Sequence, residues 1–283
     1  MIADLVLVTL GLIGLLFGSV TDIRKREVPD WMNYSLIAAG IGIRLINGLV
    51  SNDPGYFTSG LIGLAIMFAI GNIMYYTRQW GGGDAKLLIA LGAIFATRPY
   101  FIETNYPFLL ILFINIIFFG AIYGVLYGLF LAIKNRKEFL TECKKLVKTP
   151  AVRALKLFIL AFVVMFILSM IFFENKMISI FIGIAALFFI VMTYSWILMK
   201  SVENACMYKV ITVDKLTPGD WIVDPSIKKK YGIPALGIEK KQVEAIRNSG
   251  VKNIEIKEGI PFVPSFLIGF LITILSGKAL LLF

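Results

Sequence analysis

The chain has 283 residues, of which 58% are apolar and only 16% are charged, and its mean hydropathy is +0.84. Soluble domains are about half apolar and about a quarter charged, so this composition indicates an integral membrane protein. The chain contains no histidine. This excludes Ser-His-Asp and Cys-His nucleophilic triads, HExxH zinc sites and every mechanism that moves protons through an imidazole ring.

Apolar segments of helical length recur along the chain. A helix that crosses a bilayer needs about 20 mostly apolar residues, and eight segments meet or approach this length: 5–21, 31–50, 57–77, 84–97, 106–133, 155–173, 177–199 and 264–283. We expect the first segment to be retained, because it lacks the basic region and small-residue cleavage pattern of a signal peptide. The sequence therefore predicts an all-α polytopic membrane protein of about eight transmembrane helices, although 84–97 has a length more typical of a buried or re-entrant helix.

The basic residues predict how these helices are oriented. With eight crossings and the N-terminus outside the cell, 24 of the 28 Lys and Arg residues lie on the cytosolic side, as the positive-inside rule requires. If 84–97 did not cross, the basic cluster from Lys134 to Lys156 would move outside, so the charges favour a crossing. We expect a multi-pass plasma-membrane protein whose inner face attracts anionic lipid. No nucleic-acid partner is expected, because the basic runs lack interleaved aromatic residues.

One sizeable polar segment, residues 200–263, interrupts this pattern. Residues 221–223 and 252–257 read as strands, and 239–248 reads as a helix ended by Gly250. We therefore expect three parts: a membrane core with seven spans (1–199), a small cytosolic α/β appendage (200–263) and an eighth transmembrane helix (264–283). Cys143 and Cys206 are too few for a tetrahedral zinc site, and no metal or cofactor is expected.

Two acidic residues lie where predicted spans end or begin. Asp22 directly follows the first span and Asp84 opens the fourth, so both are expected at the cytosolic ends of their helices. Two carboxylates that meet at one depth can act as an aspartic protease does: the ionised one activates a water molecule, and the protonated one polarises the scissile carbonyl. From position alone, Asp22 is also compatible with the first charge of a solvated loop, and Asp84 with a helix N-cap.

The residues around Asp84 add to this picture. Gly81, Gly82 and Gly83 allow positive φ angles and a close approach of another main chain, which would leave extended backbone beside Asp84 for a substrate strand. A plain flexible turn is the alternative. Lys86 is poorly placed for the dipole of a helix that starts here. It is therefore a candidate for tuning a carboxylate or holding a lipid phosphate, unless it only marks the cytosolic side.

Residues 81–84 form a GxGD motif, and 81–86 fit the longer form GxGDxK. With Asp22 ahead of a basic loop and of Val28-Pro29-Asp30, residues 1–135 resemble the type IV prepilin peptidase and archaeal preflagellin peptidase family. Residues 259–264 resemble the C-terminal extension of its archaeal members. The resemblance implies a membrane aspartyl protease of the GxGD class, with Asp22 and Asp84 as the catalytic pair. It would remove the short basic leader of a prepilin or preflagellin at the cytosolic face.

Bacterial members often methylate their product as well and carry a zinc domain with paired CxxC motifs. This chain contains no CxxC motif, so we expect neither methyltransferase activity nor zinc. A presenilin-like or signal-peptide-peptidase-like protease, a transporter and a non-catalytic scaffold remain the alternatives.

A basic leader that approaches a chain of net charge +10 is repelled, so nearby acids are needed to hold it. Glu27 and Asp30, close to Asp22 in the sequence, are the candidates for this role. The alternative is that they belong to a solvated loop and a helix N-cap.

Overall fold

The computed structural model describes residues 1–173 and 176–279, and the chain forms two compact units. The first unit holds residues 1–124 and 211–283, and the second holds residues 125–210. The boundaries predicted at 199/200 and 263/264 stay predictions.

Six helices in the described part of the chain are long and apolar enough to cross a membrane: α1 (Ile2–Lys25), α2 (Asp30–Val50), α3 (Pro54–Tyr76), α5 (Phe108–Lys134), α7 (Pro150–Phe172) and α8 (Lys176–Cys206). The predicted spans 84–97 and 264–283 correspond to shorter helices, α4 (Gly82–Ile94) and α11 (Val263–Ser276). Residues 280–283 of the last predicted span lie outside the described residues. A mostly helical membrane fold is thus confirmed, whereas the count of eight crossings stays a prediction.

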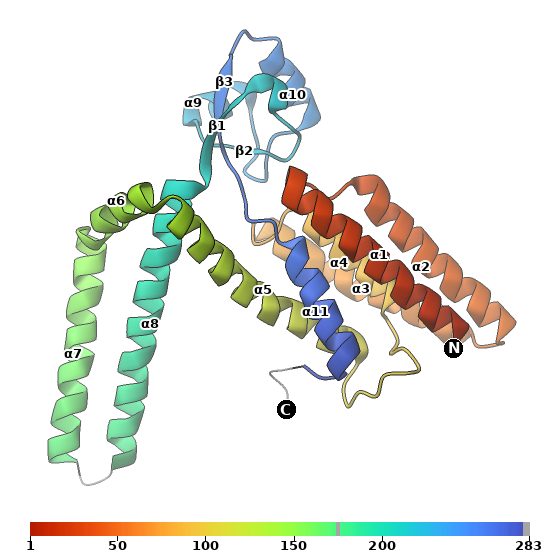
Figure 1. Ribbon diagram of the computed structural model, residues 1–283, viewed down its shortest axis with the longest axis horizontal. Coiled ribbons are helices and arrows are strands. Elements are labelled where there is room, and N and C mark those ends of the chain that lie inside the picture. Colours follow the sequence, from red (N-terminus) through yellow and green to blue (C-terminus); the bar gives the residue numbers. More distant parts are fainter. Residues whose placement is uncertain (174–175, 280–283) are drawn as a thin grey trace. The chain divides into compact units, whose positions relative to one another are not determined.

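The short helix α4 is the centre of the first unit. It packs against α3, α2 and α1 (Figure 1), and its side chains at Leu87, Leu88, Ala90, Leu91 and Ala93 are all at most 1% exposed. Its 13 residues extend about 20 Å, which is less than the roughly 30 Å of a hydrocarbon core. The helix is therefore enclosed by longer helices, which explains why it can be short.

Glycines let α4 approach its neighbour α3 closely. A Cβ atom placed on Gly63 of α3 would collide with the carbonyl oxygen of Gly92, and one on Gly92 would lie 2.5 Å from the carbonyl oxygen of Gly63. No larger residue fits at either position unless the helices separate. Small residues at such crossings are typical of helix packing within membranes.

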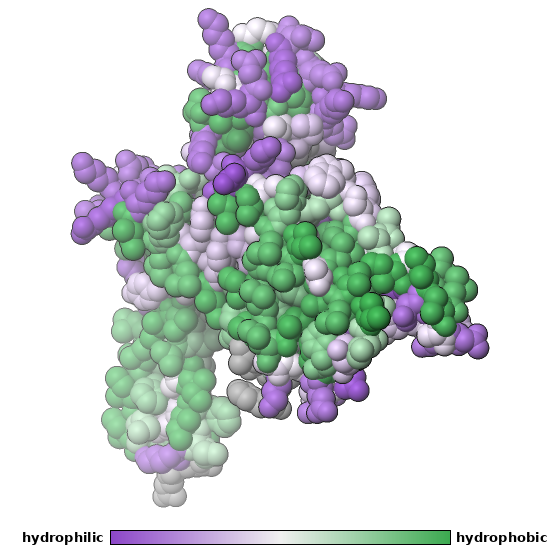
Figure 2. All heavy atoms as spheres, turned by 45° about the vertical axis from the view of Figure 1, so that its right-hand side comes forward, coloured by the Kyte–Doolittle hydropathy of each residue, from purple (hydrophilic) through white to green (hydrophobic). Residues whose placement is uncertain are grey.

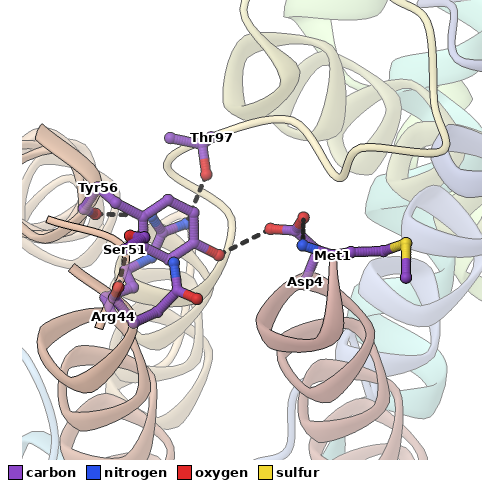
Figure 3. A network of polar contacts seen from close by, with 7 residues as sticks. Met1, Asp4, Arg44, Ser51, Tyr56 and Thr97 are labelled. Carbon is purple, nitrogen blue, oxygen red and sulfur yellow. Dashed lines mark hydrogen bonds and ion pairs between the residues drawn. The ribbon is translucent and has the colours of Figure 1, made fainter. Parts of the chain in front are cut away.

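A buried polar network closes the C-terminal end of α4 (Figure 3). Arg44 of α2 is 0% exposed. Its Nε donates to the carbonyl of Ala93 and its Nη2 to that of Ile94, both at 2.8 Å. Last-turn carbonyls have no donor within their own helix, so Arg44 supplies what α4 lacks. Its guanidinium lies 4.8 Å from the ring centre of Tyr56, whose hydroxyl donates to Asp4 at 2.7 Å.

The second unit contains an antiparallel helical hairpin made by α7 and α8 (Figure 1). Phe158, Phe162 and Phe189 pack across it with ring centres 4.9–5.1 Å apart. Helix α6 (Arg136–Val147), which the apolar pattern did not predict, precedes the hairpin and has no buried residues. It carries much of the basic cluster that begins at Lys134.

The segment after α8 contains a three-stranded sheet of order β1 (Tyr208–Thr212), β3 (Asn253–Lys257), β2 (Trp221–Ile222). The antiparallel pair β2–β3 aligns Trp221 with Lys257 and Ile222 with Ile256. The predicted strands at 221–223 and 252–257 are therefore confirmed.

Helix α10 (Lys240–Arg247) confirms the predicted helix 239–248, but its C-cap is Asn248 and not Gly250. Its Val243 and Ile246 pack on Ile254 and Ile256 in a small separate core. The sequence did not predict β1 or the short helix α9 (Pro225–Tyr231).

Hydrophobic side chains cover most of the helical surface that Figure 2 shows, and hydrophilic ones gather over the strands, α9 and α10. On α1 alone, Ile13, Phe17 and Val20 are 42–60% exposed. Contiguous apolar surface of this kind is rare on soluble monomers, and it suits contact with lipid.

Candidate active site

Asp22 lies in the last turns of α1 and is buried, at 6% exposed. The interpretation of Asp22 as the first charge of a solvated loop is therefore wrong, because the helix continues through Lys25. Its Oδ2 accepts a hydrogen bond of 2.9 Å from the main-chain N–H of Val263. Val263 is the first residue of α11, where N–H groups lack partners within the helix and a carboxylate is favourable. Asp22 thus links the end of α1 to the start of α11.

Asp84 lies in the first turn of α4, which begins two residues earlier than the sequence predicted. Its Oδ2 accepts a 3.1 Å hydrogen bond from the main-chain N–H of Gly81, which is the N-cap residue. The alternative interpretation, that Asp84 is itself the N-cap, is therefore wrong, although its carboxylate helps to close the helix start. The side chain is partly exposed.

The three glycines act differently from the expectation. None of Gly81, Gly82 and Gly83 has a positive φ. Gly81 is extended, at φ −69° and ψ 162°, whereas Gly82 and Gly83 are already helical. Another segment of this chain approaches Gly83 closely, where a Cβ atom would lie 3.0 Å from the Cβ of Val28; the approach of a substrate strand stays a prediction. The motif therefore lets the α1–α2 connection pack directly on α4.

Asp22 and Asp84 lie at the same end of two helices that pack together. α1 contacts α4, and the two carboxylates are near enough for their charges to interact. Residues distant in the sequence are thus brought together at one end of the bundle. The network of Arg44 lies at the opposite end of α4. Among residues 1–173 and 176–279, no group of three or more Cys, Asp or Glu side chains could hold a metal ion.

The flanking charged residues form two separate groups. Lys86 Nζ lies 2.6 Å from Oδ1 of Asp30, and the ammonium lies 5.7 Å from the ring centre of Tyr34. Asp30 therefore has a cationic partner from the GxGDxK segment. Glu27 is exposed and belongs to the second group.

That second group contains Glu27, Asp220 and Glu258. Burial raises the pKa of Asp220, and the nearby charges of Glu27 and Glu258 add to this effect. Hydrogen bonds from the N–H and hydroxyl of Thr217, at 2.8 and 3.2 Å, act in the opposite direction. Three acids from the α1–α2 connection and the β-containing segment thus lie within electrostatic reach of one another.

Sequence reasoning did not predict the aromatic side chains around the motif. Trp80, directly before Gly81, has its ring centre 5.6 Å from that of Phe262 and 5.1 Å from that of Phe266. Phe262 directly precedes Val263, whose main-chain N–H donates to Asp22, and Phe266 lies about one turn further along α11. Trp80 in front of the glycines was the only signal, and nothing in the sequence shows its distant partners.

Asn33 of α2 is a second residue that sequence reasoning missed. It is 0% exposed, and its Nδ2 donates to the carbonyl of Gly83 at 3.4 Å.

Comparisons with known proteins converge on one family. Residues 9–125 match the family described as the type IV leader peptidase family. The chain is 26% identical over 153 residues to prepilin peptidase EppA of Methanothermobacter thermautotrophicus. It is 32% identical over 120 residues to a preflagellin peptidase of Methanococcus maripaludis, and 33% identical over 84 residues to that of Methanocaldococcus jannaschii. These matches include 50%, 39% and 30% of this chain and span 40%, 52% and 36% of the relatives' own lengths.

Proposed function

We propose that the chain belongs to the type IV leader peptidase family, which residues 9–125 match, and that it is a membrane aspartyl endopeptidase that removes leader peptides from prepilin-like or preflagellin-like precursors. The observation that carries this proposal is the placement of Asp22 and Asp84 at the same end of the packed helices α1 and α4. The names of the relatives, prepilin peptidase and preflagellin peptidase, supply the substrate class.

The proposed chemistry uses the two carboxylates as a pair. Two neighbouring acids cannot both ionise cheaply, so in the proposed reaction they share one proton. The ionised carboxylate removes a proton from a water molecule, which attacks the scissile carbonyl, and the protonated one donates to the carbonyl oxygen. The chain has no histidine, so an acid pair is the natural proton carrier. The pair titrates as a unit with shared macroscopic pKa values.

We place the reaction at the cytosolic face, with the N-terminus outside, because this orientation leaves most basic residues inside. Glu27 is the stronger candidate for holding a basic leader residue, because it is exposed and Asp220 and Glu258 add negative charge beside it. Asp30 is the weaker one, because Lys86 already pairs with it. Glu27, Asp220 and Glu258 would offset the repulsion between a basic leader and the positively charged chain.

The test is co-expression of the full chain with a leader-bearing pilin or flagellin precursor, with cleavage followed by the change in precursor mass. Asp22→Asn and Asp84→Asn should each abolish cleavage, because an amide can neither take up nor release the catalytic proton. Asp53→Asn is the matched control. Asp53 is an exposed N-cap of α3 that accepts from Gly55 N–H, and asparagine caps equally well.

Full cleavage by either Asp22→Asn or Asp84→Asn, with both proteins present in the membrane, would refute the proposed chemistry. The leader-binding part has its own test. Glu27→Lys should raise KM for a substrate with a basic leader and leave KM unchanged for one whose leader is neutral. If Glu27→Lys has the wild-type KM for the substrate with a basic leader, the leader-binding role of Glu27 is refuted. The peptidase proposal would remain intact.

A further inference from the structure

Residues at and just before the start of α2 contact the GxGDxK segment. Val28 packs on Gly83, Asp30 pairs with Lys86 at 2.6 Å, and the Nδ2 of Asn33 donates to the carbonyl of Gly83 at 3.4 Å. Val28 and Asn33 both contact Gly83, which directly precedes Asp84. Of these contacts, the one made by Asn33 comes from a completely buried polar side chain.

Asn33 is costly for stability in this position. Its Oδ1 is buried and accepts no hydrogen bond from any residue in the described ranges, and an unpaired buried acceptor lowers the stability of the folded protein. The single bond that Asn33 donates, at 3.4 Å, is longer than the usual range and so offsets little of this cost. Its buried neighbours on α2, Met32 and Leu36, are apolar. With an apolar side chain at position 33, the folded protein would be at least as stable.

The location of the unpaired groups is informative. Within the described part of the first unit, the buried side-chain oxygens without a hydrogen bond are Ser19 Oγ and Asn33 Oδ1. Ser19 lies three residues before Asp22 on α1, and Asn33 contacts the residue before Asp84. Ser19 is thus about one helical turn from one proposed catalytic acid, and Asn33 contacts the residue next to the other. Polar groups that lower stability inside a membrane bundle are expected at functional sites.

We propose that Asn33 is a positioning residue, whose amide holds the Gly83 carbonyl and thereby fixes the start of α4 so that Asp84 faces Asp22. This inference rests on the proposed peptidase function. Asn33 acts through the main chain of Gly83 and takes no part in proton transfer. The misplacement of a reacting group by about 1 Å can reduce a rate about 100-fold, so a single hydrogen bond at this point has a large effect on turnover and a small one on stability.

The experiment uses the full chain, purified in detergent, and measures kcat and KM on a leader-bearing precursor together with thermal unfolding. Asn33→Leu removes the amide at nearly constant volume. We expect kcat to fall about 10- to 100-fold, KM to stay near the wild-type value, and the unfolding midpoint to stay equal or rise. Asn33→Gln, which restores an amide donor, should recover part of kcat. Met32→Leu is the matched control, because it changes a buried neighbour without touching a hydrogen bond.

A second readout does not depend on activity. Amide hydrogen exchange over residues 80–87 should become faster in Asn33→Leu and stay unchanged in Met32→Leu. If Asn33→Leu does not accumulate, Asn33→Ser can be used instead, because its shorter side chain also loses the hydrogen bond to the Gly83 carbonyl. The same fall in kcat is expected.

Wild-type kcat in Asn33→Leu would overturn the inference. So would a loss of kcat that only follows a lowered unfolding midpoint and is not relieved by Asn33→Gln. If Asp22→Asn and Asp84→Asn are inactive while Asn33→Leu is fully active, the positioning role fails and the peptidase proposal stands. If those aspartate variants retain cleavage, the peptidase proposal itself fails.

Discussion

The C-terminal end of α4 depends on one side chain, Arg44, and its replacement by methionine should destabilise the first unit strongly. The guanidinium donates to the carbonyls of Ala93 and Ile94 at 2.8 Å and to the hydroxyl of Thr97 at 3.1 Å. Methionine keeps an unbranched side chain of similar length but donates nothing. Two buried last-turn carbonyls then lose their donor.

The magnitude follows from those two carbonyls. A buried polar group left without its partner costs about 1–3 kcal/mol, so Arg44→Met should lower the free energy of unfolding by about 2–6 kcal/mol. This is a large part of the 5–15 kcal/mol that typical folded proteins have. Arg44→Lys should fall between wild type and Arg44→Met, because an ammonium lacks the planar fork with which arginine reaches two carbonyls.

The assay is equilibrium unfolding in mixed micelles, with rising mole fractions of sodium dodecyl sulfate, followed by circular dichroism. Arg98→Met is the matched control, because Arg98 is an exposed arginine beyond the same helix end and should change stability by less than about 0.5 kcal/mol. Equal unfolding curves for wild type and Arg44→Met would show that the carbonyls of α4 do not need this donor.

Three further changes test other contacts of the first unit. Gly63→Ala should lower the unfolding midpoint because its Cβ would collide with the main chain of α4, whereas Gly42→Ala, which has no neighbour within 4 Å, should leave it equal or raise it; equal effects would contradict the packing argument. Phe266→Ala removes a fully buried ring beside Trp80 and should cost about 3–5 kcal/mol in unfolding free energy, and a loss below 1 kcal/mol would argue against this core. The folded-state pKa of Asp220 is raised above its unfolded value of 3.8, so the ionised carboxylate lowers stability at neutral pH. This unfavourable contribution disappears as the pH falls from the raised pKa to below 3.8. Asp220→Asn should therefore stabilise the protein at pH 7 and not at pH 3, as measured by unfolding at both pH values.

Much of this fold could be predicted from the sequence because its signals are local. Long apolar runs and the alternating residues 252–257 led to α1, α2, α3, α5, α7, α8 and β3. The sequence also indicated Asp22, Asp84 and Lys86, because acids at helix ends and a glycine-rich motif are visible as short patterns. The contacts of these residues were not predictable. That Asp22 accepts from Val263 and Lys86 pairs with Asp30 depends on which helices are neighbours.

The errors have physical causes as well. Positive φ was expected for Gly81–Gly83 because three glycines permit it, but the helix start at Gly82 leaves only helical or extended angles. Gly83 instead meets a packing requirement imposed by Val28, a residue of another segment. Helix α6 was missed because a basic amphipathic helix lacks the apolar run by which membrane spans are recognised.

The two ends of α4 are held by different chemistry, and this difference separates stability from turnover. At the C-terminal end, Arg44 makes short bonds to buried carbonyls that have no alternative donor, so the contact is a large stabilising term. At the other end, Asn33 makes one long bond and leaves an oxygen unpaired, so its contact stabilises little. A helix fixed firmly at its C-terminal end keeps its fold when the weaker contact that positions Asp84 at the other end is lost. Arg44→Met should therefore lose fold and activity together, whereas Asn33→Leu should lose activity alone.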